Sequence, residues 1–391
     1  MRLLLVHDHR FQIYENEFYS HTFSRSVIRR YTNIFPHLTI VARCETRESR
    51  PKIPPASSPR CDIHCLDNIS TLSSFLTHTR KDVEKKLRGY IGESDGVIVR
   101  LPSELGLLAA SICMQIGRRY SVEVVGCGKD AMRYYGGIFP LLYSPILYRR
   151  MAKAIAGASA VSYVTDSFLQ KRYPPSDSAF TISVSNVDIP PSDDSILRRR
   201  VKKIDEMGKR VVFGTIANLD MRYKGIDTAI RALSAIDDFA MEYRILGPGD
   251  GNRLYELAER VGIERILRFD GEVYDDEALF SWLDEIDIYL QPSRHEGLPR
   301  ALIEAMSRGC PAIGSDAGGI PELLPEESIF PRNDSGELGK RIVSLCRDKK
   351  RISGEASRNF ERAKTFSPDR IETCRMKFLR HIANGYERKG P

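Results

Sequence analysis

Two glutamates in the C-terminal half of the chain have the residue type and spacing to bind a ligand rich in hydroxyl groups. Seven residues separate Glu296 from Glu304, and His295 precedes the first of them. A carboxylate accepts hydrogen bonds from adjacent sugar hydroxyls without a metal or an unusual pKa. Because Glu296 comes just before an expected helix and Glu304 lies inside it, we expect the two carboxylates at different depths of one site.

The same segment has the pattern of a phosphate-binding turn. An apolar strand ends at Gln291, a polar loop follows, and Pro299 suits the first position of a helix that stops before Gly309. The free N–H groups and the dipole of a helix N-terminus attract phosphate oxygens. A second glycine turn at 316–322 opens another expected helix at Pro321. We therefore expect two anion-binding turns to face one cleft.

A larger set of residues in this segment falls into one recognisable register. A single glycine or glutamate here would be an ordinary turn or surface residue, but the combination is specific. The set is Ser293, Glu296, Gly297, Pro299, Glu304, Ala305, Met306, Gly309, Pro311, Gly318, Gly319 and Glu322. In this register the segment resembles the donor site of retaining glycosyltransferase family 4. The resemblance implies an α/β fold of the GT-B type, with two Rossmann-like domains whose parallel sheets face a central cleft.

The resemblance extends upstream to 214–225, which looks like the second phosphate-binding segment of the family and ends in Lys224 and Gly225. It implies that Lys224 contacts the diphosphate and that Glu296 lies near the donor sugar, so both form the catalytic set. The family pattern has an arginine shortly before this lysine, and here Arg222 either substitutes for it or points to solvent. The donor-binding set that the resemblance implies is Glu304 on the ribose, the backbone of Gly297, Leu298 and Pro299 near the diphosphate, Gly271 near the base, and Ser293, His295 and Arg222.

The N-terminal half resembles the family more loosely, as an acceptor-binding domain would. The glycine pair that follows the first strand in the family is absent, and a histidine common in the middle of that domain is not evident. His7, Arg100, Ser103 and the loop from Gly126 to Asp130 are expected to face the cleft on the acceptor side. Alternatively, His7 has a structural role inside the fold.

The elements that must position these residues alternate between short apolar runs and segments of helical periodicity, which predicts parallel sheets with crossover helices. We expect an acceptor domain at 1–188, a linker at 189–208, a nucleotide-sugar domain at 209–367, and a closing helix at 368–391 that crosses back to the first domain. The expected strands are 3–7, 38–42, 96–101, 122–126, 160–165 and 181–184, then 211–216, 243–246, 267–270, 288–291, 312–315 and 328–330.

Composition and charge restrict the other possibilities. The 391 residues exceed the usual size of one core, and no long apolar run or signal peptide is evident, which predicts a cytoplasmic protein of two domains. The eight cysteines are scattered and lack the spacing of a zinc site, so free thiols and no metal are expected.

The net charge of +7 is concentrated in basic clusters at 25–30, 80–88, 149–153 and 198–203. These clusters are either solvated faces or surfaces that attract an anionic membrane or a phosphorylated acceptor. Nucleic-acid binding is not expected, because no recognition motif accompanies the basic stretches. The segment 134–150 mixes aromatic residues with a basic end, which is typical of a packed core or of an element at the surface of the inner membrane.

The functional hypothesis is transfer of a sugar from a nucleoside diphosphate sugar, with UDP as the expected nucleotide, to a hydroxyl of a glycan or lipid-linked acceptor. We expect the anomeric configuration to be retained. We expect neither a cofactor nor an essential metal. The alternatives are a nucleotide-sugar epimerase of the same fold and a non-catalytic subunit that binds the donor.

Overall fold

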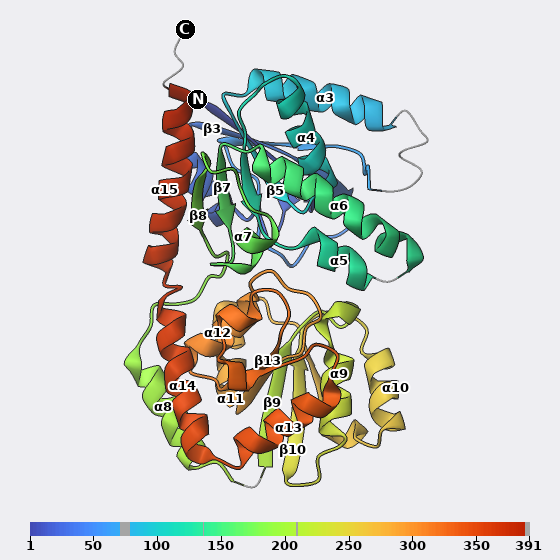
Figure 1. Cartoon of the computed structure of the whole chain (residues 1–391), viewed down its shortest axis with the longest axis vertical. Helices are drawn as coiled ribbons and strands as arrows, with labels where there is room; N and C mark the ends of the chain where they lie inside the picture. The colour runs from blue at the N-terminus through green and yellow to red at the C-terminus, as the bar shows by residue number, and fades with distance from the viewer. Residues whose placement is uncertain (71–78, 136, 209, 388–391) are drawn as a thin grey trace.

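The chain forms two α/β halves, one above the other in Figure 1, and each is built on its own sheet. The computed structural model describes residues 1–70, 79–135, 137–208 and 210–387. Helices α14 (Lys349–Lys364) and α15 (Pro368–Glu387) follow one another along one side of the molecule, first beside the C-terminal half and then beside the N-terminal half. The predicted α/β fold with two parallel sheets is confirmed.

Within the described residues, the sheet of the N-terminal half has eight strands in the order β4-β3-β1-β5-β6-β7-β8, with β2 added to β1. Neighbouring strands are parallel except in the hairpin of β1 and β2. The strands are β1 (Arg2–Tyr14), β2 (Glu17–Tyr19), β3 (His37–Thr46), β4 (Cys61–Cys65), β5 (Gly96–Leu101), β6 (Ser121–Val124), β7 (Ala160–Tyr163) and β8 (Phe180–Ser183). The helices are α1 (Arg25–Thr32), α3 (Thr79–Glu93), α4 (Glu104–Gln115), α5 (Gly128–Tyr135), α6 (Ile138–Ala156) and α7 (Phe168–Arg172).

The second sheet is parallel throughout, in the order β11-β10-β9-β12-β13-β14. Its strands are β9 (Arg210–Ile216), β10 (Ala240–Leu246), β11 (Leu267–Gly271), β12 (Ile288–Gln291), β13 (Ala312–Ser315) and β14 (Ile329–Phe330). Its helices are α9 (Ile226–Leu233), α10 (Asn252–Arg260), α11 (Asp276–Glu285), α12 (Arg300–Ser307) and α13 (Ser335–Cys346), with 3₁₀ turns η1 (Arg222–Lys224), η2 (Glu264–Ile266), η3 (Ile320–Glu322) and η4 (Glu326–Ser328).

The expected strands are present because helices cover both faces of the sheets, so that central strands are apolar runs. All six residues of β5 are buried, as are all four of β12. Two strands were not predicted. The edge strand β4 has the sequence Cys-Asp-Ile-His-Cys, which is too polar for an apolar run, and β2 exists because β1 continues beyond His7 and folds back.

The segment expected to be the linker, 189–208, is largely helical. Helix α8 (Asp194–Asp205) begins after Asp193, whose carboxylate accepts the N–H of Ser195. Most of its basic run is a solvated face, with Arg198, Arg199 and Lys202 exposed. The buried Arg200 is the exception, because it donates hydrogen bonds to the carbonyls of Leu283 and Ile286 and thereby attaches the helix to the C-terminal half. The helical period was not recognised because Arg200 occupies a buried position between Ile196 and Ile204, where an apolar residue is expected.

Helix α15 packs on the sheet of the N-terminal half. Its apolar residues Phe378, Leu379 and Ile382 share one core with Leu3 and Leu5 of β1. The last residues of the expected closing helix, 388–391, lie outside the described residues.

The expectation that all cysteines are free thiols is wrong for one pair. Cys44 of β3 and Cys65 of β4 form a disulfide. The two strands are parallel neighbours, with Ala42 opposite Cys65, which brings the Cα atoms of the two cysteines to 5.5 Å. Sequence spacing missed the pair because β4 itself was not predicted.

Candidate donor site and interdomain cavity

The loop between β12 and α12 is organised around the carboxylate of Glu296. Its Oε1 atom accepts hydrogen bonds from Ser293 Oγ at 2.7 Å, Gln291 Nε2 at 3.1 Å and Lys224 Nζ at 2.8 Å. Glu296 is 8% exposed, so its charge is offset by these donors and not by water. The structure therefore brings together three sequence-predicted residues, Glu296, Ser293 and Lys224. It adds Gln291, which was expected only as the end of the strand.

Lys224 reaches Glu296 because the 3₁₀ turn η1 is tied to the same loop. Arg294 donates two hydrogen bonds to the carboxylate of Asp227 and another to the carbonyl of Arg222. Burial opposes the charge of Lys224, but the carboxylate of Glu296 outweighs it and raises the pKa of Lys224. Lys224 is therefore a fixed cation at neutral pH. The Arg222 side chain, expected as a phosphate ligand, is exposed.

Glycines allow the loops around Glu296 to approach one another and the N-terminal half. A Cβ atom on Gly297 would lie 2.4 Å from the carbonyl oxygen of Val125, which follows β6. Gly318 has a φ of +58°, and a Cβ there would lie 2.2 Å from the carbonyl oxygen of Glu296. The N–H of Gly319 donates to the carbonyl of Gly297 at 2.7 Å. These positions need glycine because backbone occupies the space of a side chain.

The second glycine turn does not open the expected helix at Pro321. It forms only the 3₁₀ turn η3, and its carboxylate Glu322 reaches across to the N-terminal half. Glu322 accepts the backbone N–H groups of Asp166 at 2.7 Å, Ser167 at 3.0 Å and Phe168 at 2.5 Å. This turn therefore joins the two halves through the start of α7, a role that the sequence did not indicate. Helix α12, by contrast, begins at Arg300, directly after Pro299.

Glu304 lies on α12 in a half-buried position without a side-chain hydrogen bond to any residue that the structure describes. Burial raises the pKa of Glu304 to about 7, the carboxylates of Asp276 and Asp188 act in the same direction, and Arg300 opposes them. Such a carboxyl has free hydrogen-bonding capacity for ligand hydroxyls.

The structure places the remaining expected donor residues in different surroundings. The ring of His295 lies edge-on to Tyr223, with 5.8 Å between the ring centroids, and its Nδ1 atom is buried without a partner among the described residues. Burial lowers the pKa of His295. Leu298 packs against the cores of both halves, and Gly271 ends β11 at an exposed position with a φ of +73°.

On the acceptor side, two expected residues are committed to the fold. Ser103 accepts the N–H of Gly106 and caps α4, and Asp130 forms an ion pair with Arg172 at 3.1 Å. Burial, with the nearby Arg100 charge, holds the pKa of His7 well below its usual range, so His7 is neutral and half-buried. The side chains of Ser103 and Asp130 thus have partners within the N-terminal half, whereas Arg100 lines a cavity between the halves.

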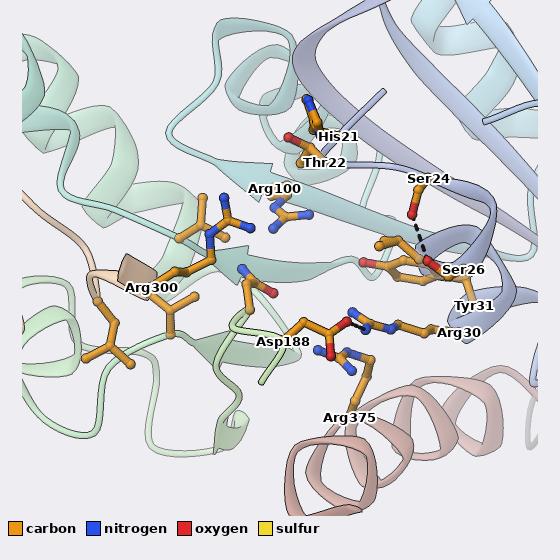
Figure 2. Close-up of a pocket in the computed structure, with 15 residues that line it drawn as sticks. His21, Thr22, Ser24, Ser26, Arg30, Tyr31, Arg100, Asp188, Arg300 and Arg375 are labelled. Atoms are coloured by element: carbon orange, nitrogen blue, oxygen red, sulfur yellow. Dashed lines mark hydrogen bonds and ion pairs between the residues drawn. The ribbon is translucent and has the colours of Figure 1, made fainter. Parts of the chain in front are cut away.

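That cavity has a volume of about 360 Å³ and joins residues from distant parts of the chain (Figure 2). Sequence reasoning found only Arg100 and Leu298 in it, because the other residues follow no shared motif. Its lining comprises His21, Thr22, Ser24, Ser26, Val27, Arg30, Tyr31, Arg100, Val125, Val164, Asn186, Asp188, Leu298, Arg300 and Arg375.

Two parallel-sheet halves and a donor-type loop at the end of β12 define a class of protein. Residues 210–348 match the family described as "Glycosyl transferases group 1". The chain belongs to this family of glycosyltransferases, identified from the sequence as glycosyltransferase family 4, and it has the GT-B fold.

Individual relatives agree with this assignment. Protein CapJ of Staphylococcus aureus is 31% identical over 374 residues, covering 92% of this chain and 93% of its own. The putative colanic acid biosynthesis glycosyltransferase WcaL of Escherichia coli is 34% identical over 134 residues, 31% of this chain and 33% of its own. The structure of Anabaena HepE in complex with UDP-glucose shares the fold, with a TM-score of 0.65, 16% identity and coverage of 98% of this chain and 100% of that one.

Proposed function

We propose that this glycosyltransferase transfers a sugar from a UDP-sugar, with retention of anomeric configuration, to a hydroxyl of a glycan or lipid-linked acceptor in polysaccharide biosynthesis. The observation that carries the proposal is the contact of Lys224 with Glu296 in the loop that ends β12. The name of WcaL and the UDP-glucose bound to HepE support the acceptor class and the nucleotide.

In the proposed site, some residues stabilise negative charge and others bind hydroxyl groups. Departure of the diphosphate develops negative charge, which Lys224 and the N–H groups before α12 stabilise electrostatically. Glu296 binds hydroxyls of the donor sugar, and Glu304 binds the ribose. This arrangement supplies its own cation, so the proposal includes neither an essential metal nor a cofactor.

A thermal-shift series tests the donor site, because a ligand that binds only the folded state raises Tm. UDP, GDP, ADP and their sugars are compared on the wild type, on Glu304→Ala, and on a matched control, Glu259→Ala, whose side chain is exposed on α10. A shift with UDP that Glu304→Ala reduces and Glu259→Ala keeps supports the proposal. The absence of a shift with every nucleotide contradicts it.

Product analysis separates the alternatives that share this fold. Transfer of the sugar to an acceptor, with the anomeric configuration read by NMR, supports a retaining transferase. Conversion of the UDP-sugar to its epimer without an acceptor indicates an epimerase. Binding of UDP without turnover across donors and acceptors indicates a scaffold subunit.

We also propose that the start of α6 contacts the membrane that carries a lipid-linked acceptor. Five large apolar side chains are exposed there by half or more, and the basic residues Arg149 and Lys153 are exposed further along the helix. The five are Ile138 at 77%, Phe139 at 51%, Leu141 at 52%, Leu142 at 67% and Ile146 at 50%. The proposed contact is with the membrane surface. Among the described helices, none is both long and apolar enough to cross a bilayer.

Sedimentation with liposomes that contain anionic lipid tests this contact. Arg150 is unsuitable for charge reversal, because it forms an ion pair with Glu104 at 2.7 Å inside the fold. We expect Leu141→Ser with Leu142→Ser, and separately Arg149→Glu with Lys153→Glu, to lower the bound fraction. Arg265→Glu, at a side chain 94% exposed in the other half, is the control. Unchanged binding of both double variants would exclude the contact.

A further inference from the structure

The interdomain cavity gathers arginines from four separate elements around a single acidic side chain. Arg30 comes from α1, Arg100 from β5, Arg300 from α12 and Arg375 from α15. Figure 2 shows these side chains arranged around Asp188. No continuous motif produces this cluster, and it exists only because the two halves and the closing helix meet there.

Arg100 indicates that the cluster is open to a ligand. The residue is only 7% exposed, yet its guanidinium makes no hydrogen bond to any described residue. Its contacts are the ring of Phe23, with 5.2 Å to the centroid, and Glu123, whose nearest oxygen is 3.9 Å away. A buried guanidinium normally has hydrogen-bond acceptors, so the N–H groups of Arg100 are available to an anion in the cavity.

The remaining charges do not neutralise the lining. Arg30 forms an ion pair with Asp188 at 3.2 Å, and Arg375 with Glu372 at 3.0 Å outside the cavity. Arg300 forms no ion pair with any residue in the described part of the chain. Burial lowers the pKa of Arg30, the adjacent Arg375 charge acts in the same direction, and Asp188 and Glu372 oppose them. An anionic ligand would offset the charges of these arginines.

We propose that this cavity binds an acidic sugar unit of the acceptor, held through a uronate carboxylate or a sugar phosphate. Arginine recognises either group through paired N–H donors. Thr22, Ser24, Ser26 and Asn186 line the same space and provide partners for sugar hydroxyls. The volume is that of a small-molecule site. The inference rests on the proposed function, because it assigns the acceptor subsite of the same reaction.

The lining of the cavity differs from the loop between β12 and α12, residues 292–299, which we call the donor loop. Leu298 of that loop and Arg300 at the start of α12 line the cavity, whereas Lys224, Glu296 and Glu304 do not. Most of the cationic lining belongs to the N-terminal half and α15, on the side where an acceptor is expected. An acceptor held there lies next to Leu298, at the edge of the donor loop.

Ligand titration by calorimetry and ligand-observed NMR tests the proposal with matched probes. Methyl glucuronide and methyl glucoside differ only at C6, which is a carboxylate in the first and a hydroxymethyl group in the second. Glucose 6-phosphate provides the phosphate arm. We expect the protein to bind methyl glucuronide or glucose 6-phosphate at least about tenfold more tightly than methyl glucoside. Which of the two anionic probes binds more tightly identifies the source of the charge.

Two variants assign the binding to the cavity. Arg30→Gln and Arg300→Gln are each expected to weaken binding of the anionic probe by about tenfold, while Arg265→Gln leaves this affinity unchanged. Two different positions are used so that a folding defect at one, detected by circular dichroism, does not decide the result. Equal affinity for charged and neutral sugars, no binding of either anionic probe, or unchanged binding by both variants would overturn the proposal.

Competition with UDP distinguishes this subsite from the donor site. We expect UDP at saturation to leave the anionic probe bound, whereas displacement would show that the arginines serve the donor diphosphate and would overturn the proposal. A protein that binds UDP but neither anionic probe would refute this subsite alone. A protein that binds an anionic probe but no nucleotide would refute the proposed donor function.

Discussion

The ammonium of Lys224 lies 2.8 Å from the carboxylate of Glu296, and each group compensates the burial of the other. The two residues are 72 positions apart and belong to different strand-to-helix connections of one sheet. A diphosphate bound at this loop would compete with Glu296 for the lysine. In the proposed reaction, the pair would hold a cation in place before the donor arrives, which limits reorganisation during the reaction.

Replacement of Lys224 tests this arrangement. We predict that Lys224→Met lowers kcat by roughly 10²–10³-fold, the usual cost of removing one group that stabilises developing negative charge. Steady-state transfer kinetics measure the change. Lys340→Met is the control, because the Lys340 side chain is 79% exposed. A kcat close to that of the wild type would remove Lys224 from the mechanism.

The pKa of Glu304 predicts a pH dependence of stability. Its folded pKa of about 7 exceeds the value of 4.5 for a free side chain, so between these values the folded protein keeps a proton that the unfolded chain releases. The free energy of unfolding therefore falls as pH rises through this window. Glu304→Gln removes this contribution, and we predict that it is more stable than the wild type at about pH 8, by on the order of 1 kcal/mol, and closer to it at about pH 4.

Urea unfolding of the wild type and Glu304→Gln at the two pH values measures this difference. Glu259→Gln, at an exposed position, is expected to show no such pH-dependent difference. If the stability difference between Glu304→Gln and the wild type were independent of pH, Glu304 would not carry the raised pKa.

The contact of Gly297 with Val125 predicts that a methyl group separates the two halves. A Cβ atom 2.4 Å from a carbonyl oxygen is not tolerated, so Gly297→Ala must displace the donor loop from the N-terminal half. We predict a loss of kcat/KM of about 10²-fold, as for other small misplacements of reacting groups. Gly354→Ala is the matched control, because no described atom beyond its own turn of α14 lies within 4 Å of its added Cβ. Activity of Gly297→Ala equal to that of Gly354→Ala would contradict the prediction.

The cap that Glu322 provides for α7 predicts a measurable coupling of the halves. An amide accepts these backbone N–H groups less strongly than a carboxylate, so Glu322→Gln should lower the free energy of unfolding by ~1–3 kcal/mol. Hydrogen exchange at the amides of Ser167 and Phe168 should accelerate at the same time. Glu326→Gln, at an exposed carboxylate, is expected to change neither quantity. Unchanged exchange at both amides would show that the cap does not hold α7.

Much of the fold could be predicted because local patterns agree with the final structure. Buried parallel strands such as β5 and β12 are continuous apolar runs. A strand that is buried on both faces can therefore be predicted from its own sequence, without knowing which residues it contacts. The signal failed where a local pattern is broken by a long-range partner. Arg200 interrupts the apolar stripe of α8 because its guanidinium meets carbonyl groups more than 80 residues away.

The sequence by itself determined the class of protein and the donor loop, because the loop and its glycines are contiguous and their backbone requirements are local. Only the tertiary structure placed Lys224 against Glu296, Glu322 on the start of α7, and four arginines around one cavity. Those relationships join segments that are distant in the chain. Each depends on how the sheets and the closing helix pack, and packing leaves no period or spacing in the sequence from which such contacts could be derived.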